Sequence, residues 1–597
     1  MAPQFTHSTS ERRASATVFG SIGRGGLYVP QDFIKSNTDE ILNSIENEVE
    51  QSIDDDISIG DESSSLLLHK SKSKSILIDE AKLLHANKVP IRKYSIVEQP
   101  IDNNNITYGS TNDGDDNGQV VDPEAILESW DEALKSGKIT TTNSFELKSL
   151  TRSSIPLVIT FLLQNSLGVC SVFAVGKISN EALAAITLGT MSANISAMSV
   201  IAGLASSLDT FLPQAYGANK FKIVGLIFQR CTALIFVIMF VICISWWIGS
   251  EWLLLKVLPD PISAKLASLY LKVLSFGIPG YILFETGKRF LQSQGIFDAS
   301  TYILFICAPL NAIMNYLFVW TFGFGFIGAP IAVSLSYTFM AIGLYLYTIY
   351  TNHEINPMKC WDGLNLKKSF SNWNELIKLS IPNLIMIMSE FLSFEILTLL
   401  SSYLGTNALA AQSIITTMAS LTYQIPYGVS IAASTRIANF LGAQLPKPAK
   451  IASKMTFLMT IFISIVNFSF LFICRYKIAS WFSNDLKVIE LVGDVMPLVA
   501  FIQFFDALNA TSAGCLRGQG LQHIGGYINL FSYYVIGIPV GFILSFYLPL
   551  GHPLGLVGLW LGVGCALFII GFVQCYYVLT ANYDDLVNDA LNRSNTE

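Results

Sequence analysis

Apolar residues dominate twelve stretches of the chain between residues 150 and 580, and short polar segments separate them. A helix needs about 20 apolar residues to cross ~30 Å of hydrocarbon, and every one of these stretches is long enough. The pattern predicts an all-α integral membrane protein with twelve transmembrane helices, at about 150–176, 181–212, 221–248, 263–288, 297–321, 328–351, 373–404, 407–440, 450–474, 486–515, 524–548 and 555–580.

The apolar part of the chain contains an internal repeat. The tripeptide Ser-Ile-Pro at 154–156 recurs at 380–382, and Ala-Leu-Ala-Ala at 182–185 recurs at 408–411. Each half then holds six helices, and because six is even, both halves enter the membrane in the same direction. This predicts two six-helix lobes related by a parallel repeat, whose axis runs along the membrane normal. Two such lobes can enclose a cavity and rock to open it to either side, which is alternating access.

The charge is unevenly distributed. The chain is 51% hydrophobic and 14% charged, but residues 1–145 alone carry 24 acidic and 13 basic residues, a net charge of −11 within a total of −7. This polar composition is typical of disorder. The predicted organisation is a disordered acidic cytosolic tail, an N-terminal lobe, a cytosolic linker, a C-terminal lobe and a cytosolic C-terminal tail, at 1–145, 146–352, 353–372, 373–580 and 581–597.

Lysine and arginine are more frequent in the connections on the side of the tail, which places both termini in the cytosol. Lys288 and Arg289 are assigned to one of these cytosolic connections. Two segments ending at Leu67 and Leu84 resemble acidic dileucine sorting signals. The expected location is the vacuolar membrane, with the plasma membrane as the alternative.

Five of the carboxylates inside the apolar stretches stand out: Asp209, Glu285, Glu390, Glu395 and Asp506. A charge at the centre of a bilayer costs about 2.5–3.5 kcal/mol on the insertion scale. Such groups bind a cation, carry a proton, or pair with a buried base. They are therefore the candidates for the functional chemistry of the chain.

Three charged residues in or beside the apolar stretches have simpler interpretations. Glu285 lies four residues before Arg289, a spacing typical of an ion pair on one helix. Arg436 and Arg517 lie near the predicted cytosolic helix ends, where long basic side chains anchor at the membrane interface. These residues are expected to be structural.

Other chemistries find no support in the sequence. The chain has no Walker loop, no Gly-rich cofactor loop and no nucleophile elbow, and its nine cysteines form no CxxC pair. We expect no enzymatic activity, no cofactor, no bound metal and no nucleic-acid partner. The expected partners are the lipid bilayer, small solutes and ions, and the protein is expected to be monomeric.

Three long segments resemble the signatures of the MATE family of multidrug and toxic compound extrusion transporters, in its fungal branch. They are Gly203–Ala218, Pro426–Ala443 and Phe505–Asn529. The resemblance covers about 150–580. It implies an antiporter that exports organic, often cationic, solutes or xenobiotics in exchange for protons, or for sodium in some members.

The resemblance also assigns roles to residues. It places the coupling carboxylates in the C-terminal lobe, at Glu390, Glu395 and Asp506, although Phe391 and Leu392 stand where two tryptophans often follow the first glutamate. Some bacterial members use an aspartate in the first helix. This chain has Gln164 and Asn165 there, so no proton site is expected on that helix.

Asp506 and Glu390 are the leading candidates for proton coupling, because a carboxyl group in apolar surroundings is protonated more readily. Glu395 lies five residues beyond Glu390, or about 140° around a helix, so it is expected to assist from another face. Further residues that line the cavity or serve a structural role are Asp209, Gln214, Tyr423, Asn439 and Asn509. The alternatives are a sodium-coupled antiporter, a flippase for a lipid-linked precursor, and a receptor that has retained the fold.

Overall fold

The structure, a computed structural model, describes residues 94–95, 119–120, 141–176, 178–218, 220–257, 261–351, 355–483, 485–547 and 554–595. The chain divides into two compact units, residues 1–145 and 146–597. In the first unit, β1 (Tyr94–Ser95) pairs antiparallel with β2 (Gln119–Val120). The rest of the tail predicted to be disordered lies outside the described residues as far as residue 140, as do the dileucine segments. Its last residues, 143–145, belong to α6 (Asn143–Val175), which continues into the second unit.

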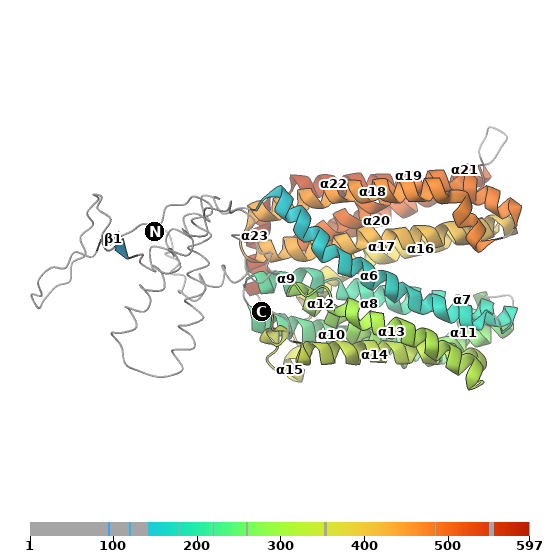
Figure 1. Ribbon diagram of the computed structural model, residues 1–597, viewed down its shortest axis with the longest axis horizontal. Helices are drawn as coiled ribbons and strands as arrows, with labels where there is room; N and C mark the ends of the chain where they lie inside the picture. The colour runs from blue at the N-terminus through green and yellow to red at the C-terminus, as the bar shows by residue number, and fades with distance from the viewer. Residues whose placement is uncertain are drawn as a thin grey trace, which may run out of the picture. The chain divides into compact units, whose positions relative to one another are not determined.

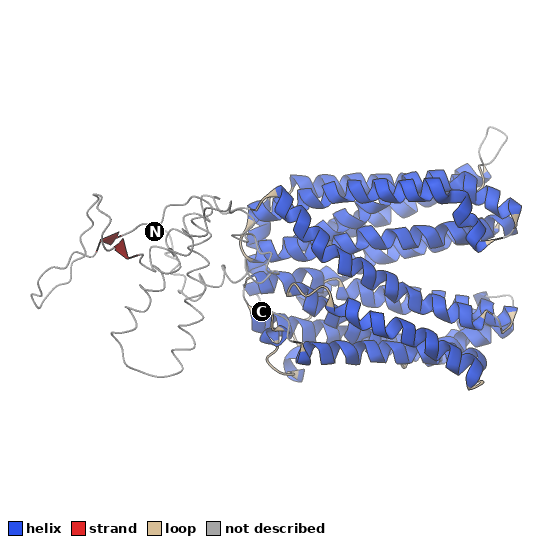
Figure 2. Ribbon diagram, viewed as in Figure 1, coloured by secondary structure: helices blue, strands red, loops and turns tan. Residues whose placement is uncertain are grey.

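Helices make up most of the described part of the second unit (Figure 2). The N-terminal half contains α6 (Asn143–Val175), α7 (Asn180–Ala193), η1 (Asn194–Met198), α8 (Ser199–Ala205), α9 (Leu208–Gly217), α10 (Phe221–Val257), α11 (Pro261–Leu274), α12 (Ile278–Ser293), α13 (Ala299–Tyr316), η2 (Leu317–Thr321), η3 (Gly325–Ile327) and α14 (Gly328–Tyr350). After the short helices η4 (Pro357–Cys360) and α15 (Leu366–Ser369), the C-terminal half contains α16 (Asn374–Ser402), α17 (Thr406–Gly442), α18 (Pro446–Phe482), α19 (Leu486–Gln519), α20 (Gln522–Phe531), η5 (Ser532–Gly537), α21 (Ile538–Phe546), α22 (Leu556–Thr580) and α23 (Tyr583–Asn595).

These helices account for the twelve predicted spans. Ten are long and apolar enough to cross a membrane, and α11 with α12 forms an eleventh that is bent by 56°. The bend precedes Pro279, whose missing N–H is tolerated in the first turn of α12. The twelfth is α17, which is 37 residues long but less apolar because it carries many polar side chains.

The repeat is visible in the helix boundaries. α7 begins at Asn180 and its counterpart α17 at Thr406, while α10 begins at Phe221 and its counterpart α18 at Pro446, so matching helices start at a nearly constant separation. The two halves differ in continuity, however. The second span is broken into α7, η1, α8 and α9 in the first half, whereas its counterpart α17 is one helix.

Each half has its own hydrophobic core. One cluster of buried apolar side chains extends from Leu167 to Leu376 and the other from Leu397 to Ile570. Figure 1 shows the two halves as neighbouring layers of helices, with α6 crossing from one to the other. Two six-helix lobes are thus confirmed.

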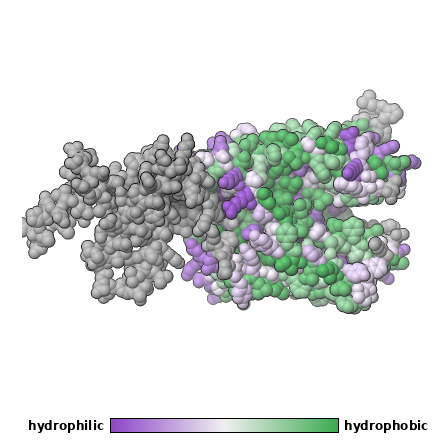
Figure 3. Space-filling model, viewed as in Figure 1, coloured by the Kyte–Doolittle hydropathy of each residue, from purple (hydrophilic) through white to green (hydrophobic). Residues whose placement is uncertain are grey.

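The surface of the helical unit is suited to lipid. Figure 3 shows apolar residues along its flank and hydrophilic residues near its ends. Large apolar side chains point outward there, among them Phe173, Ile248 and Ile473, which are 74%, 81% and 78% exposed. An environment of hydrocarbon explains why so much apolar surface stays uncovered by protein.

The lobes cross most closely where α9 meets α17. A Cβ atom added to Gly217 would lie 2.2 Å from the Asn439 carbonyl oxygen, and one added to Gly442 would lie 2.1 Å from the Gln214 carbonyl oxygen. The repeat relates both pairs, since Gly217 corresponds to Gly442 and Gln214 corresponds to Asn439. Glycine therefore allows direct backbone contact at a symmetric crossing of the two lobes.

Candidate functional site

Three helices and one π-helical turn of the C-terminal lobe bring the leading carboxylates together. Glu390 projects from α16 beside the Tyr423 hydroxyl of α17 and the Asn509 amide of α19. Asp506, one turn before Asn509, interacts electrostatically with Glu390, and Tyr533 of η5 interacts with both acids. We call Glu390, Tyr423, Asp506, Asn509 and Tyr533 the carboxylate cluster.

Asp506 is one of three buried members of this cluster, together with Asn509 and Tyr533. Its side chain is buried, and Gln503 Nε2 donates a hydrogen bond of 3.3 Å to Oδ2. Within the described part of the chain, Oδ1 has no hydrogen-bond partner. Leaving a buried polar atom without a partner costs about 1–3 kcal/mol of stability. Binding of a proton, or of a hydrogen-bond donor on a bound solute, at Oδ1 would remove this cost.

Unused polar groups and aromatic rings surround the two acids. Both amide atoms of Asn509 and the Tyr533 hydroxyl lack hydrogen-bond partners among the described residues. The rings of Tyr423 and Tyr427 stack with centroids 5.8 Å apart, and Phe161 of α6 meets Tyr427 at 4.8 Å. The arrangement offers carboxylates, donors and aromatic faces, which together suit an organic cation.

Glu395 does not join this cluster. It is half-buried, and its carboxylate forms neither a hydrogen bond nor an ion pair with any other described residue. Its placement on another face of α16 follows from the five-residue spacing. The assisting role of Glu395 therefore stays a prediction.

A second set of buried charges lies where the lobes meet. Arg289 Nη1 contacts Glu285 Oε2 at 2.6 Å, which confirms the predicted helix pair. Lys288 Nζ contacts Glu285 Oε1 at 2.6 Å, and Arg289 Nε contacts Asp209 Oδ1 at 3.1 Å. Arg517 of the other lobe approaches Asp209 Oδ2 at 3.9 Å. These five residues form the ion cluster.

The structure corrects two interpretations of the basic residues. Lys288 and Arg289 are not in a loop, because both are buried within α12. Arg517 and Arg436 are not exposed anchors, since both are buried and paired, and Arg436 Nη2 donates to Glu146 Oε1 of α6 at 2.8 Å. Charged side chains near a membrane surface can be buried when a carboxylate from another helix balances them.

Sequence reasoning also missed the part played by Gln164. Its Nε2 donates to Glu285 Oε1 at 2.7 Å, and its Oε1 accepts from Lys288 Nζ at 3.1 Å. Lys288 and Arg289 follow Glu285 by three and four residues, which was the available signal that both reach the same carboxylate. The spacing within α12 could not show that Gln164 of α6 also reaches Glu285 and Lys288.

Gln214 and Asn439 lie at the crossing of α9 and α17 and not in the carboxylate cluster. Gln214 Nε2 donates to the Gly518 carbonyl oxygen at 3.3 Å and so joins the lobes. The side-chain amide of Asn439 is buried and has no hydrogen-bond partner among the described residues.

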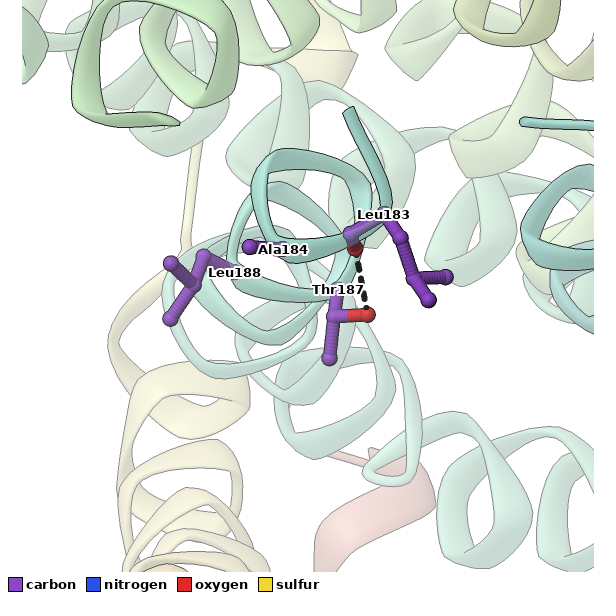
Figure 4. Close-up of a pocket in the computed structure, with 4 residues that line it drawn as sticks. All are labelled: Leu183, Ala184, Thr187 and Leu188. Carbon is purple, nitrogen blue, oxygen red and sulfur yellow. Dashed lines mark hydrogen bonds between the residues drawn. The ribbon is translucent and has the colours of Figure 1, made fainter. Parts of the chain in front are cut away.

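A hollow of about 410 Å³ lies elsewhere, along α7 (Figure 4). It is lined by Leu183, Ala184, Thr187 and Leu188. Its lining carries no charge, and the Thr187 hydroxyl already donates to the Leu183 carbonyl oxygen at 2.9 Å. The candidate chemistry therefore resides in the carboxylate cluster and not in this hollow.

Two lobes that meet at a symmetric crossing, with carboxylates enclosed in one of them, define a membrane transporter of the two-lobe class. A sequence profile of the MatE family matches residues 156–317 and again residues 382–543, which are the two halves of the repeat. The chain belongs to the MATE family and is a multi-pass membrane transporter with two lobes of six helices.

Relatives of known sequence agree with this assignment. An uncharacterized transporter of Saccharomyces cerevisiae is 43% identical over 76% of this chain and 64% of its own length. An uncharacterized transporter of Schizosaccharomyces pombe is 40% identical over 74% of this chain and 80% of its own length. The human multidrug and toxin extrusion protein 1 is 31% identical over 76% of this chain and 78% of its own length.

A solved structure has the same fold. The crystal structure of a eukaryotic MATE transporter matches with a TM-score of 0.69 and 28% identity, and the match covers 75% of this chain and 100% of that one.

Proposed function

We propose that this protein is an antiporter that exports organic, cationic solutes from the cytosol in exchange for protons. The observation that carries the proposal is a pair of neighbouring carboxylates, the half-buried Glu390 and the buried Asp506. Neither forms an ion pair with any lysine or arginine in the described part of the chain. An acid without a fixed counter-charge must find a proton or a cation elsewhere.

Exchange follows from competition for the same carboxylates. When the cavity faces the cytosol, ionised Glu390 and Asp506 attract the cationic solute, and Tyr423 and Asn509 orient it. After the lobes rock, protons neutralise the acids and the solute leaves. Because one group cannot favour both occupants at once, binding of either reduces the affinity for the other.

A flippase for a lipid-linked precursor is the alternative from another class. Such a precursor carries phosphates and would be favoured by an uncompensated basic site. The carboxylate cluster has the opposite charge, which supports a cationic solute. We further propose a vacuolar location, cytosolic termini and a monomeric state, with the tail, linker and lobe boundaries given above.

The choice of coupling ion can be tested in proteoliposomes that contain the purified full-length chain. We expect a pH gradient to drive accumulation of radiolabelled tetraethylammonium, and a sodium gradient at constant pH to drive none. Protein-free liposomes and liposomes with the gradient collapsed by an ionophore are the controls. Accumulation driven by a sodium gradient alone would identify sodium as the coupling ion. The absence of accumulation under either gradient would refute the proposed export of cations.

A further inference from the structure

The helix that follows the last membrane span, α23, is amphipathic. Its buried residues recur at the spacing of one helix face and are Tyr583, Leu586, Val587 and Ala590. The aspartate and asparagine residues between them are exposed. Asn582 caps the first turn, since its Oδ1 accepts a hydrogen bond of 3.2 Å from the backbone N–H of Asp584. This part of the predicted C-terminal tail is therefore a capped helix with one face covered by protein.

Both lobes cover the buried face of α23. It packs against α17 and α18 of the C-terminal lobe and against α9 of the N-terminal lobe (Figure 1). At its start, the Tyr583 hydroxyl donates to Ser453 Oγ at 2.8 Å and accepts from Gln519 Nε2 at 2.9 Å. These partners belong to the C-terminal lobe, to which α22 joins the helix. The start of α23 is therefore held on its own lobe.

The last turn of α23 reaches the other lobe through one side chain. Arg593 Nε donates to Gln214 Oε1 of α9 at 3.2 Å, and Arg593 Nη2 donates to the Gln519 carbonyl oxygen of α19 at 3.4 Å. The planar guanidinium can hold two acceptors at once. Gly520, with a φ of +79°, leaves room for it, because a Cβ atom there would lie 2.5 Å from Arg593 Nη1. Arg593 thus ties the two lobes together.

This tie lies beside the closest crossing of the lobes. The carbonyl oxygen of Gln214 is the atom that a Cβ at Gly442 would meet at 2.1 Å, so the lobes are closed at this end. Gln214 moves with the N-terminal lobe, whereas α23 moves with the C-terminal lobe. Any rocking that opens this end must therefore break the hydrogen bond between Arg593 and Gln214.

We propose that α23 is a clasp that stabilises the state in which the lobes are closed at this end. It holds Gln214 through Arg593 and must release it before the end can open. With the cytosolic termini proposed for this chain, release of the clasp precedes entry of the solute from the cytosol, and this consequence rests on the proposed function. The clasp itself requires that the lobes rock and depends on neither the solute nor the coupling ion.

The opening of this end can be followed with a cysteine introduced at Ser434. Ser434 of α17 is buried, and its hydroxyl donates to the Asp209 carbonyl oxygen of α9 at 3.4 Å. It lies about 12 Å along α17 from Gly442, so a reagent reaches it when the two lobes separate. The measurement is the rate at which N-ethylmaleimide labels the purified full-length protein. Mass spectrometry of the peptide that contains position 434 keeps the native cysteines out of the readout.

Removing the tie should accelerate labelling. We expect Arg593→Ala to raise the rate about tenfold, because opening no longer breaks a hydrogen bond to a charged group. Arg593→Lys should give an intermediate rate, since an ammonium group lacks the planar fork. Gln214→Ala removes the acceptor from the other lobe and should also raise the rate. Adding Arg593→Ala to Gln214→Ala should then change little, because the same hydrogen bond is already missing.

Tyr583→Phe is the matched control on the same helix. It removes buried hydrogen bonds whose partners, Ser453, Gln519 and the Val578 carbonyl oxygen, all belong to the C-terminal lobe. The labelling rate should therefore stay near that of the parent. Asp584→Asn, on the exposed face, should leave the rate unchanged.

Two outcomes would overturn the clasp. One is an unchanged or lower labelling rate in Arg593→Ala. The other is an equal rise in Tyr583→Phe, which would show that α23 only stabilises its own lobe. Thermal unfolding midpoints in the same detergent should be equal in Arg593→Ala and the parent, and a matching loss of stability would likewise contradict a specific tie. Failure of tetraethylammonium transport would refute the proposed function and leave the labelling result in place.

Discussion

Replacing Asp506 by asparagine is expected to reduce pH-gradient-driven transport at least about tenfold, which corresponds to roughly 1.4 kcal/mol. Asparagine has nearly the same shape but cannot take up or release a proton. The enclosed Asp506 Oδ1 has no partner that could substitute for that proton in the described part of the chain. Glu390→Gln should have the same effect, because each acid is needed for the site to change its charge. The measurement is the initial rate of tetraethylammonium uptake in proteoliposomes.

Matched controls lie on the same two helices. Asp494 is exposed on α19 and Glu375 pairs with Lys378 at the surface of α16. Asp494→Asn and Glu375→Gln should therefore transport at the wild-type rate. Exchange of internal for external solute without a gradient should persist in Asp506→Asn if the variant still folds and binds. Normal gradient-driven uptake by Asp506→Asn and Glu390→Gln would refute the proposed coupling.

Adding a methyl group at the crossing of the lobes should destabilise the present state. Gly442→Ala would place Cβ 2.1 Å from the Gln214 carbonyl oxygen, and Gly217→Ala would place it 2.2 Å from that of Asn439. These contacts are with backbone atoms, which cannot rotate away. Overpacking of this kind costs about 1–3 kcal/mol. We expect the thermal unfolding midpoint in detergent to fall and the transport rate to fall with it.

Gly249→Ala on α10 is the matched control for this effect. A Cβ atom at Gly249 meets nothing within 4 Å. Alanine is the better helix former by about 0.5–1 kcal/mol, so this variant should be as stable as the parent or slightly more stable. Unfolding midpoints that are equal in Gly442→Ala and Gly249→Ala would show that the lobes do not touch at this crossing.

The membrane fold could be predicted because its cause is local. Hydrocarbon requires long apolar helices, so the spans could be found from composition alone. The two lobes could be predicted from the repeat, since matching helices begin at a nearly constant separation along the chain. The bend in the fourth span could be anticipated, because Pro279 stands beside it. The break in the second span could not be predicted, because no such signal stands at 194–207.

The site was predicted in part. Glu390 and Asp506 stood out as acids in apolar stretches, and the family resemblance placed them in one lobe. The partners of Asp209 were not predictable, because Arg289 and Arg517 lie far along the chain on other helices, and Arg517 belongs to the other half of the repeat. A carboxylate in an apolar stretch looks the same in sequence whether a buried base neutralises it or not.

The sequence by itself therefore determined the class of protein, the number of helices and the residues that carry unusual charge, because these depend on composition and spacing. Only the tertiary structure decided which charges neutralise one another. Asp209 and Glu285 are balanced by bases, whereas Glu390 and Asp506 form no ion pair among the described residues. The physical reason is that electrostatic energy depends on distances of a few ångströms between helices, and those distances are set by the packing of the two lobes.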